Sequence, residues 1–476
     1  MRAPFSFILN NRDVSTDAPP GMLVLDFLRE TKRLTGTKEG CREGDCGACV
    51  VLVGTMGSSG VSYRAVTSCL MPIAELDGQH LVTIEGLNGI ELSSVQQAIA
   101  EEGASQCGFC TPGIVVSLTG ALMDREAPLD SAALKTALGG HLCRCTGYRS
   151  LKATIRTLQD TPTGIDALVN AGELPLWFQT IPSRLRAIDQ ERRSRPTSPR
   201  STETLFVAGG TDLYVQQGTS IPATRISSLG ARSDLRGITT SDTHLIIGAA
   251  TTFEEIAESE LVRQIVPGIR GYMDDIASVQ IRNRATAAGN LVNASPIGDL
   301  TILLLAFETS LTLVAPDGSS RLVPLKDFYL GYKTLAKRPD ELVTAISIRR
   351  PPPDTHVSWE KVAKRRSLDI ASVNSALVIQ LDCGVVSTAT LTAGGVAAIP
   401  LRLQSTSAWL AGQPISESTV QEASRLAQSE IGPISDIRGS ADYKRLLVRQ
   451  LIWAHFAALF PQDVSIESLY KLEGSA

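Results

Sequence analysis

Eight of the nine cysteines lie before residue 150, and this placement limits how the chain can fold more than any other feature. The segment 39–51, EGCREGDCGACVV, carries three cysteines and three glycines where a hydrophobic core would use leucine and valine. Five more cysteines appear in SC, QCGFC and CRC, whereas Cys383 stands apart. This concentration of cysteines in short segments is typical of a binding site.

Composition narrows what these cysteines do. The chain is 43% hydrophobic and 20% charged with a formal net charge of −4, which is typical of a soluble globular protein of several domains and does not favour nucleic-acid binding. The N-terminal MRAPFSFILNNRD becomes charged too early for a secretory signal, and the apolar run 300–315 contains Glu308, so we expect no membrane span. We therefore expect a cytoplasmic protein, whose reduced cysteines hold metal and do not form disulfides.

The first cysteine set has the spacing C-x4-C-x2-C followed by one distant cysteine, the ligand order of a plant-type [2Fe-2S] ferredoxin. Such a loop turns three thiolates toward one cluster and aims backbone N–H groups at its sulfides, and Gly40, Gly44 and Gly47 permit that close approach. Structural zinc is the alternative, although zinc sites usually pair one C-x2-C with another. The predicted ligands are Cys41, Cys46, Cys49 and Cys69.

The second cysteine set combines C-x2-C in QCGFCTPG with C-x-C in HLCRCTGYRS, between segments of helical pattern. These spacings alone fit zinc as well as a [2Fe-2S] cluster, so at this point the residues leave the metal open. The predicted ligands are Cys107, Cys110, Cys143 and Cys145.

Hydrophobic periodicity divides the chain into successive parts. Short β-like runs surround one helical segment, LVLDFLRETKR, in the first part, and helical patterns dominate the second. The polar, proline-containing stretch 186–204 has no periodicity and is expected to be an exposed linker, after which strands and helices alternate. The predicted boundaries are 1–85, 86–165, a linker at 166–203, 204–354 and 355–476.

The segment VAGGTDL, residues 207–213, places a glycine turn between a predicted strand and a helix-like stretch, without the G-x-G-x-x-G of a dinucleotide site. Backbone N–H groups at the start of a helix bind anions, so this arrangement suits a pyrophosphate. A Gly-Gly turn by itself is usually only a turn, and the segment becomes informative only beside the motifs around it.

Four motifs together resemble one family. CREGDCGACVV with its distant SC, QCGFCTPG and CRCTGYR follow one another as in the paired [2Fe-2S] domains of the xanthine dehydrogenase and aldehyde oxidase family of molybdenum hydroxylases. QIRNRATAAGNLVNASPIGDL, residues 280–300, is similar to the second FAD motif of that family. The resemblance implies a multidomain α+β fold: a ferredoxin-like [2Fe-2S] domain, a helical-bundle [2Fe-2S] domain, an α+β FAD-binding domain of the vanillyl-alcohol-oxidase/PCMH type and a C-terminal α+β flavoprotein domain.

The resemblance also implies the residues that bind the flavin. The pyrophosphate would be cradled by Ala208, Gly209, Gly210, Thr211 and Asp212, and the pocket completed by Thr286, Gly289, Asn290, Asn293 and Asp299. Lys361 aligns with a lysine near the flavin ring, Asp369 with an acid near the nicotinamide site, and Gln106 with a residue that reaches the pterin. Some members place an aromatic residue over the flavin ring where this chain has Ile276, the nearest aromatic being Tyr272, so ring stacking is in doubt.

By the same resemblance, the chain is the small subunit of a two-subunit, NAD-dependent xanthine dehydrogenase. We expect a separate large subunit with molybdopterin, no molybdenum domain in this chain, and a dimer of heterodimers. Electrons would pass through the second cluster, the first cluster and FAD to NAD⁺. The alternatives are the same role in a molybdenum hydroxylase for aldehydes or N-heteroaromatics, a stand-alone NADH:acceptor iron-sulfur flavoprotein, and a zinc-binding scaffold.

Overall fold

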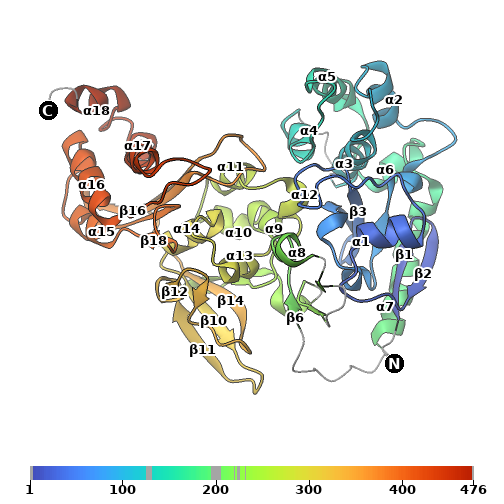
Figure 1. Cartoon of the computed structure of the whole chain (residues 1–476), viewed down its shortest axis with the longest axis horizontal. Coiled ribbons are helices and arrows are strands. Elements are labelled where there is room, and N and C mark those ends of the chain that lie inside the picture. Colours follow the sequence, from blue (N-terminus) through green and yellow to red (C-terminus); the bar gives the residue numbers. More distant parts are fainter. Residues whose placement is uncertain are drawn as a thin grey trace. The chain divides into compact units, whose positions relative to one another are not determined.

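A computed structural model describes residues 4–124, 131–193, 205–218, 220–221, 226–230 and 232–473. The chain divides into two compact units, coloured along the sequence in Figure 1. The N-terminal unit comprises Met1–Ala231 together with Ser278–Ala285, and the C-terminal unit comprises Arg232–Ala277 and Thr286–Ala476. Each unit is described by itself.

The N-terminal unit begins with a five-stranded sheet of order β2-β1-β5-β3-β4. Its strands carry the apolar residues expected of half-buried β structure, and β1 pairs with β2 in antiparallel and with β5 in parallel fashion. The predicted helix LVLDFLRETKR forms as the short helix α1 and a π-helical turn at Phe27–Thr31, whose apolar side chains pack on one face of the sheet. The bounds are β1 Phe5–Leu9, β2 Arg12–Thr16, α1 Val24–Asp26, β3 Val50–Gly57, β4 Gly60–Thr67 and β5 His80–Val82.

A helical part follows the sheet, as its periodicity predicts. Helix α2 begins with a capping box between Ser93 and Gln96, and helix α3 has Pro112 in its first turn, where proline costs no hydrogen bond. Their apolar faces share one core with residues of β3 and β4. The bounds are α2 Ser94–Glu101, α3 Thr111–Met123, α4 Ser131–Leu138 and α5 Arg149–Thr157.

Most of the segment expected as a linker at 166–203 is structured. Helix α6 (Ile165–Asn170), the 3-10 helix Leu176–Thr180 and helix α7 (Ile181–Arg193) replace the exposed tether. They form because scattered apolar residues meet on one side: Phe178 joins the core of the helical part, and Ile181 packs against Ile8 of the sheet. The rest of the predicted linker, 194–203, lies outside the described residues.

The predicted FAD domain, 204–354, contributes to both units. Strand β6 (Leu205–Val207) pairs in parallel with β7 (Ile226–Ser228), helix α8 (Leu213–Gln217) lies between them, and all three belong to the N-terminal unit. Helix α12 (Val279–Arg282) belongs to this unit as well and contacts β4 and α4. The start of the QIRN motif is thus packed with the cysteine-bearing domains.

The C-terminal unit contains a five-stranded antiparallel sheet of order β11-β10-β14-β9-β8. Its strands are β8 Ile238–Thr240, β9 His244–Gly248, β10 Ser310–Val314, β11 Ser320–Pro324 and β14 Leu342–Arg349. The accompanying elements are α9 Phe253–Glu258, α10 Glu260–Arg263, α11 Ile269–Asp274, α13 Ala287–Asn293, α14 Asp299–Ala306 and the hairpin β12 Tyr329–Gly331 with β13 Thr334–Leu335.

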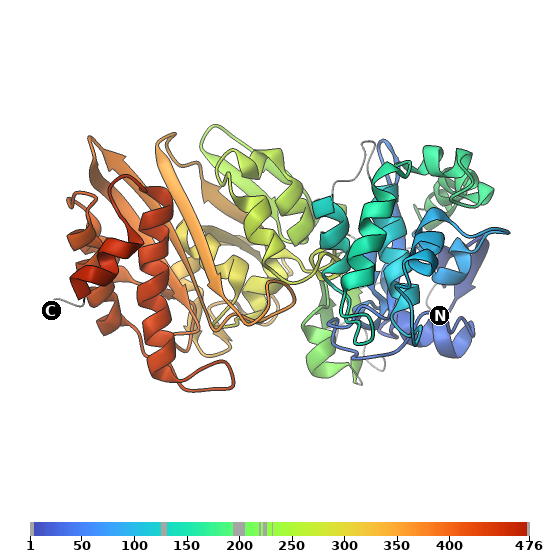
Figure 2. The ribbon, with the colours of Figure 1, turned by 90° about the horizontal axis from the view of Figure 1, so that it is seen from above.

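The rest of this unit is a four-stranded antiparallel sheet between helices, seen from above in Figure 2. Odd-numbered residues of β16, such as Val373 and Leu377, join the core of helices α16 and α17, whereas Asn374 faces the start of α14. The first half of β16 and the second half of β17 are buried on both faces, whereas the start of β17 is largely exposed. The bounds are β15 Thr355–Val362, β16 Val373–Asp382, β17 Val385–Gly394, β18 Leu401–Arg402, α15 Gln404–Leu410, α16 Glu417–Glu430, α17 Ala441–Leu459 and α18 Ile466–Glu473.

The apolar run 300–315, which we expected not to cross a membrane, divides into helix α14 and strand β10. Within the described residues, no helix combines the length and the apolarity that a membrane crossing requires.

Candidate iron-sulfur and flavin sites

The first cysteine set meets in two pairs. The Cys41 thiol hydrogen-bonds the Cys46 thiol, and the Cys49 thiol hydrogen-bonds the Cys69 thiol. Within the described residues, no three histidine, cysteine or acidic side chains converge on a site for a single ion. Two pairs of thiols are the ligand set of two irons, whereas a structural zinc ion needs four ligands around one centre. The arrangement therefore fits a [2Fe-2S] cluster.

Backbone N–H groups of the loop point at these sulfurs. The amides of Glu43 and Asp45 each donate to Cys41 Sγ at 3.3 Å, and the amide of Cys41 donates to Cys46 Sγ at 3.4 Å. The hydrogen bond from Cys46 and these amides lower the pKa of the Cys41 thiol to about 5, against the opposing effect of burial. A thiol held ready to ionise suits a metal ligand, which binds as the thiolate.

Glycine is required at several points of this loop. Gly44 and Gly47 have left-handed backbone angles, with φ of 82° and 69°. A Cβ on Gly40 would lie 2.7 Å from Cys46 Sγ, and one on Gly47 would lie 2.3 Å from His141 Nδ1. The loop thus approaches both its own sulfur and the helical part too closely for any side chain.

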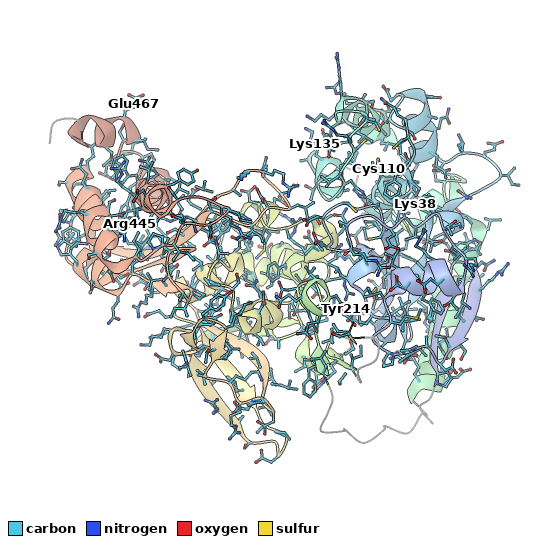
Figure 3. All side chains as sticks on the ribbon, in the orientation of Figure 1. Lys38, Cys110, Lys135, Tyr214, Arg445 and Glu467 are labelled. Atoms are coloured by element: carbon cyan, nitrogen blue, oxygen red, sulfur yellow. The ribbon has the colours of Figure 1, made fainter. Side chains whose placement is uncertain are left out.

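The second cysteine set is also paired, Cys107 with Cys145 and Cys110 with Cys143. Cys110 directly precedes helix α3 and is labelled in Figure 3. Burial and the bond to Cys143 raise the pKa of Cys110 to about 12. Although burial opposes it, the pKa of Cys143 is lowered by its contact with the Thr146 hydroxyl, 3.1 Å away. The pairing that fits two irons therefore recurs, which the spacing alone did not indicate.

One backbone hydrogen bond joins the two sets. The N–H of Leu142 donates to the carbonyl of Cys46 at 3.1 Å, and Leu142 immediately precedes Cys143. Cys46 of the first set and Cys143 of the second set therefore lie next to one shared hydrogen bond.

The predicted pyrophosphate cradle, residues 208–212, forms a tight turn between β6 and α8, and we call it the flavin turn. Gly210 is left-handed with a φ of 73°, and its carbonyl accepts from the N–H of Tyr214, labelled in Figure 3. A Cβ on Gly209 would lie 2.0 Å from the carbonyl oxygen of Arg284. Packing against protein therefore requires glycine here, whatever ligand the turn binds.

The flavin turn fits an anionic ligand. Among the described residues, none accepts a hydrogen bond from the backbone N–H of Gly209, Gly210 or Thr211. The Asp212 carboxylate accepts from the Gln216 amide. Unpaired N–H groups on a glycine turn suit a diphosphate.

The other predicted flavin residues belong to the C-terminal unit and surround helix α13. Thr286 caps this helix by accepting from the N–H of Gly289 at 3.2 Å. The Asn290 side chain accepts from the Thr301 hydroxyl at 2.8 Å, and Lys333 Nζ donates to Asn293 Oδ1 at 2.9 Å. These side chains already form hydrogen bonds within the protein, so any contact with a flavin would be made in addition to these bonds.

Asp299 and Lys361 form a buried ion pair of 2.8 Å at the start of α14. The other Asp299 oxygen accepts from Asn374 at 2.6 Å, and Lys361 Nζ also donates to the Asp275 carbonyl at 3.0 Å. Burial raises the pKa of Asp299, although Lys361 opposes that shift. Lys361 thus anchors the helix that Asp299 begins, and it is not a surface charge.

The remaining predicted residues are not gathered in one place. Asp369 accepts from the N–H of Arg365 within an exposed loop, and Gln106 is exposed beside the second cysteine set. Ile276, at the position where an aromatic residue was expected, is buried, and the Tyr272 ring packs on Trp359 with its hydroxyl on the Val357 carbonyl.

Sequence reasoning missed three polar side chains of the QIRN segment, of which Gln280 and Arg284 are buried and Asn283 is half-buried. Gln280 donates to the Ala137 carbonyl, Asn283 to the Ala65 carbonyl, and Arg284 to the Gly209 carbonyl. The available signal was that all three are polar but lie inside a motif otherwise assigned to flavin contact.

Family models describe the whole order of domains. An iron-sulfur model named "2Fe-2S iron-sulfur cluster binding domain" matches residues 7–74, and "[2Fe-2S] binding domain" matches 83–156. "FAD binding domain in molybdopterin dehydrogenase" matches 196–351, and "CO dehydrogenase flavoprotein C-terminal domain" matches 360–459. A solved structure of a Cu,Mo-CO dehydrogenase in a cyanide-inactivated form is 30% identical, with a TM-score of 0.50 over 53% of this chain and 87% of that chain. The chain belongs to the molybdenum hydroxylase family.

Members of the molybdenum hydroxylase family with longer chains match almost all of this one. A xanthine dehydrogenase of Drosophila pseudoobscura pseudoobscura is 28% identical over 95% of this chain and 39% of its own length. Aldehyde oxidase 2 of Macaca fascicularis is 28% identical over 98% of this chain and 40% of its own length. The chain thus spans about two fifths of these relatives and contains two [2Fe-2S] domains, one FAD-binding domain and one C-terminal flavoprotein domain.

Proposed function

We propose that this chain is the electron-transfer subunit of a xanthine dehydrogenase. Electrons from a molybdenum centre on a partner subunit enter the second cluster, pass to the first cluster and then to FAD, which reduces NAD⁺. The observation that carries this proposal is the match to a xanthine dehydrogenase over 95% of the chain. Within this chain, both iron-sulfur domains precede the flavin domains.

The order of the cofactors has a chemical reason. A [2Fe-2S] cluster carries one electron at a time, whereas a flavin accepts electrons singly and gives two to NAD⁺ as a hydride. The chain's own residues hold the cofactors: Cys107, Cys110, Cys143 and Cys145 the second cluster; Cys41, Cys46, Cys49 and Cys69 the first; Ala208–Asp212 the flavin diphosphate. The Leu142–Cys46 hydrogen bond supports transfer between the two clusters.

The surface of the second cysteine set supports a partner subunit. Cys107 and Cys145 are exposed, and beside them Phe109 and Leu142 are 46% and 47% exposed. Large apolar side chains next to an exposed metal site are typical of an interface. We propose that the molybdopterin-binding subunit covers them and that Gln106 reaches its pterin.

Analysis of the purified full-length chain, with any protein that accompanies it, tests this function. We expect four irons and one FAD per chain, NADH oxidation with an artificial dye, and purine oxidation only when a molybdenum-bearing large subunit is present. Zinc in place of iron, or a chain without flavin, would contradict the proposal. Purine oxidation by the chain alone would contradict the division between two subunits.

The second candidate is the same electron-transfer role in an aldehyde-oxidising enzyme, and the equal identity to an aldehyde oxidase favours keeping it. Substrate assays on the complex separate the two, because purine turnover supports the first and aldehyde turnover the second. A chain that oxidises NADH and copurifies with no large subunit would instead be a stand-alone flavoprotein.

A further inference from the structure

Arg284 of the flavin motif is buried in the N-terminal unit, and nothing in the proposed electron path uses it. Its side chain is only 5% exposed. Nη1 forms an ion pair of 2.8 Å with Glu75, whose side chain is 11% exposed. A buried guanidinium needs several partners, so the other groups around it show what it holds.

The guanidinium bridges two backbone turns. Nη2 donates to the Gly209 carbonyl of the flavin turn at 2.6 Å and to the Leu70 carbonyl at 3.3 Å. Leu70 follows the predicted ligand Cys69, and Glu75 belongs to the same stretch, residues 68–76, which we call the Cys69 turn. One side chain therefore contacts the flavin turn and the Cys69 turn at once.

The two turns also contact each other directly, through groups other than the Arg284 side chain. A Cβ on Gly210 would lie 3.3 Å from the Leu70 carbonyl, and one on Gly209 would collide with the Arg284 backbone. Cys49, Cys69 and Leu70 share one hydrophobic core with Val207 and Tyr214, on either side of the flavin turn. Hydrophobic contact brings the turns together but is not directional, whereas a planar fork of donors fixes their register.

We propose that Arg284 is a positioning residue that holds the flavin turn against the Cys69 turn and so fixes where FAD lies relative to the first cluster. The proposal rests on the proposed function only in taking FAD as the ligand of the flavin turn. Residues that orient a binding loop from behind change ligand affinity although they do not touch the ligand.

Three variants of the full-length chain test this role. Arg284→Gln removes the charge and the fork. Arg284→Lys keeps a charge for Glu75 but cannot reach both carbonyls with one planar group. Arg425→Gln is the matched control, because Arg425 pairs with Glu422 at 2.5 Å on the exposed surface of α16.

The first measurement is FAD binding by the flavin-depleted chain. We expect Arg284→Gln to weaken binding at least tenfold and Arg284→Lys to weaken it less, with Arg425→Gln unchanged. The second is hydrogen–deuterium exchange of the same flavin-free chain, where Arg284→Gln should speed exchange in 205–213 and 68–76 and leave helix α3 unchanged. The third is EPR of the reduced chain, in which the first cluster's signal should shift while the second serves as an internal reference.

The outcomes separate this inference from the proposed function. Wild-type FAD affinity together with wild-type exchange in both turns of Arg284→Gln would overturn the inference. A uniform rise in exchange that includes helix α3 would mean that Arg284 only stabilises the fold as a whole. This result would also overturn the inference. If Arg284→Gln does not fold, the same comparison is made with Arg284→Lys and Glu75→Gln. A wild-type chain that binds no FAD contradicts the proposed function, yet the exchange measurement still decides whether Arg284 holds the turns.

Discussion

The two cysteine sets have the same paired ligand chemistry but differ in exposure. In each set one pair is buried, Cys49 with Cys69 and Cys110 with Cys143. The other pair is partly exposed in the first set, Cys41 with Cys46, and exposed in the second, Cys107 with Cys145. The buried pair of the first set lies in a core shared with residues on either side of the flavin turn. Both sets use left-handed residues to turn the chain, Gly44 and Gly47 in one and Gly108, Gly147 and Tyr148 in the other. Burial, and not ligand type, distinguishes them.

This difference assigns the sets different neighbours. The buried pair of the first set shares its core with residues on either side of the flavin turn, which supports the proposal that this set exchanges electrons with the flavin. The exposed pair of the second set lies beside the exposed Phe109 and Leu142, which supports the proposed partner surface. This difference between the two sets would be refuted if they responded alike to substitution, to a partner and to thiol reagents.

The largest effect is expected from removing one ligand of each set. Cys46→Ser should abolish the first cluster's EPR signal and keep the second, and Cys145→Ser should do the reverse, because a hard alkoxide replaces a thiolate poorly. Low-temperature EPR of the dithionite-reduced chain measures both. Loss of both signals from a folded, soluble Cys46→Ser chain would show that the sites are not independent.

The next effect concerns the partner. Phe109→Glu should weaken capture of the molybdenum-bearing subunit by about 30-fold or more, since a buried aromatic anchor is worth about 2 kcal/mol or more at an interface. Both clusters should remain. Ile90→Glu is the matched control, because Ile90 is fully exposed on the loop before α2. Equal capture by both variants would place the partner elsewhere.

A smaller effect is expected in thiol chemistry. In the metal-free chain with Cys383→Ser, the exposed Cys107 and Cys145 should react with a disulfide reagent at least about tenfold faster than Cys49 and Cys69. The hydrogen bond from the Phe109 amide, which lowers the pKa of Cys107, adds to the difference. Peptide mapping of the modified cysteines against time gives the order, and a uniform rate would contradict the difference in burial.

The sequence predicted the domain classes because their signals are local. Cysteine spacing and hydrophobic periodicity act over a few residues, and the family models agree with the expected multidomain α+β fold. Helix α7 was missed because charged residues surround its few apolar ones. The spacing of Ile181, Leu185 and Ile188, which pack together, was the overlooked helical signal.

The sequence predicted which residues belong to each candidate site but not how these residues are placed in space. Spacing gave the four cysteines of each set, but which thiols pair depends on where the chain returns, and Cys69 lies at the end of a β-hairpin. The QIRN segment reads as one flavin motif, yet Arg284 lies with the Cys69 turn, and Thr286 belongs to the other unit. Such divisions arise from long-range packing, which no local pattern encodes.

The smallest expected effect concerns acid and the sheet beside the first set. His80 is buried in β5, which pairs with β3, the strand that begins directly after Cys49. Its Nε2 lies 2.9 Å from the Asn10 carbonyl and must carry the proton, so Nδ1 accepts from the Tyr63 hydroxyl at 2.6 Å. Burial lowers the pKa of His80 to about 4.

The unfolded chain therefore takes up a proton at His80 as the pH falls below about 6.5, whereas the folded chain does so only near 4. The contribution of His80 to stability is complete above the unfolded pKa and is lost progressively between these values, by about 3 kcal/mol at most. Burial also lowers the pKa values of His141 and His455, which add to the pH dependence of the whole chain. In urea unfolding between pH 7 and 4, His80→Gln should flatten this dependence, and His244→Gln, on a half-exposed strand end, should not. A pH dependence as steep in His80→Gln as in the wild-type chain would contradict this assignment.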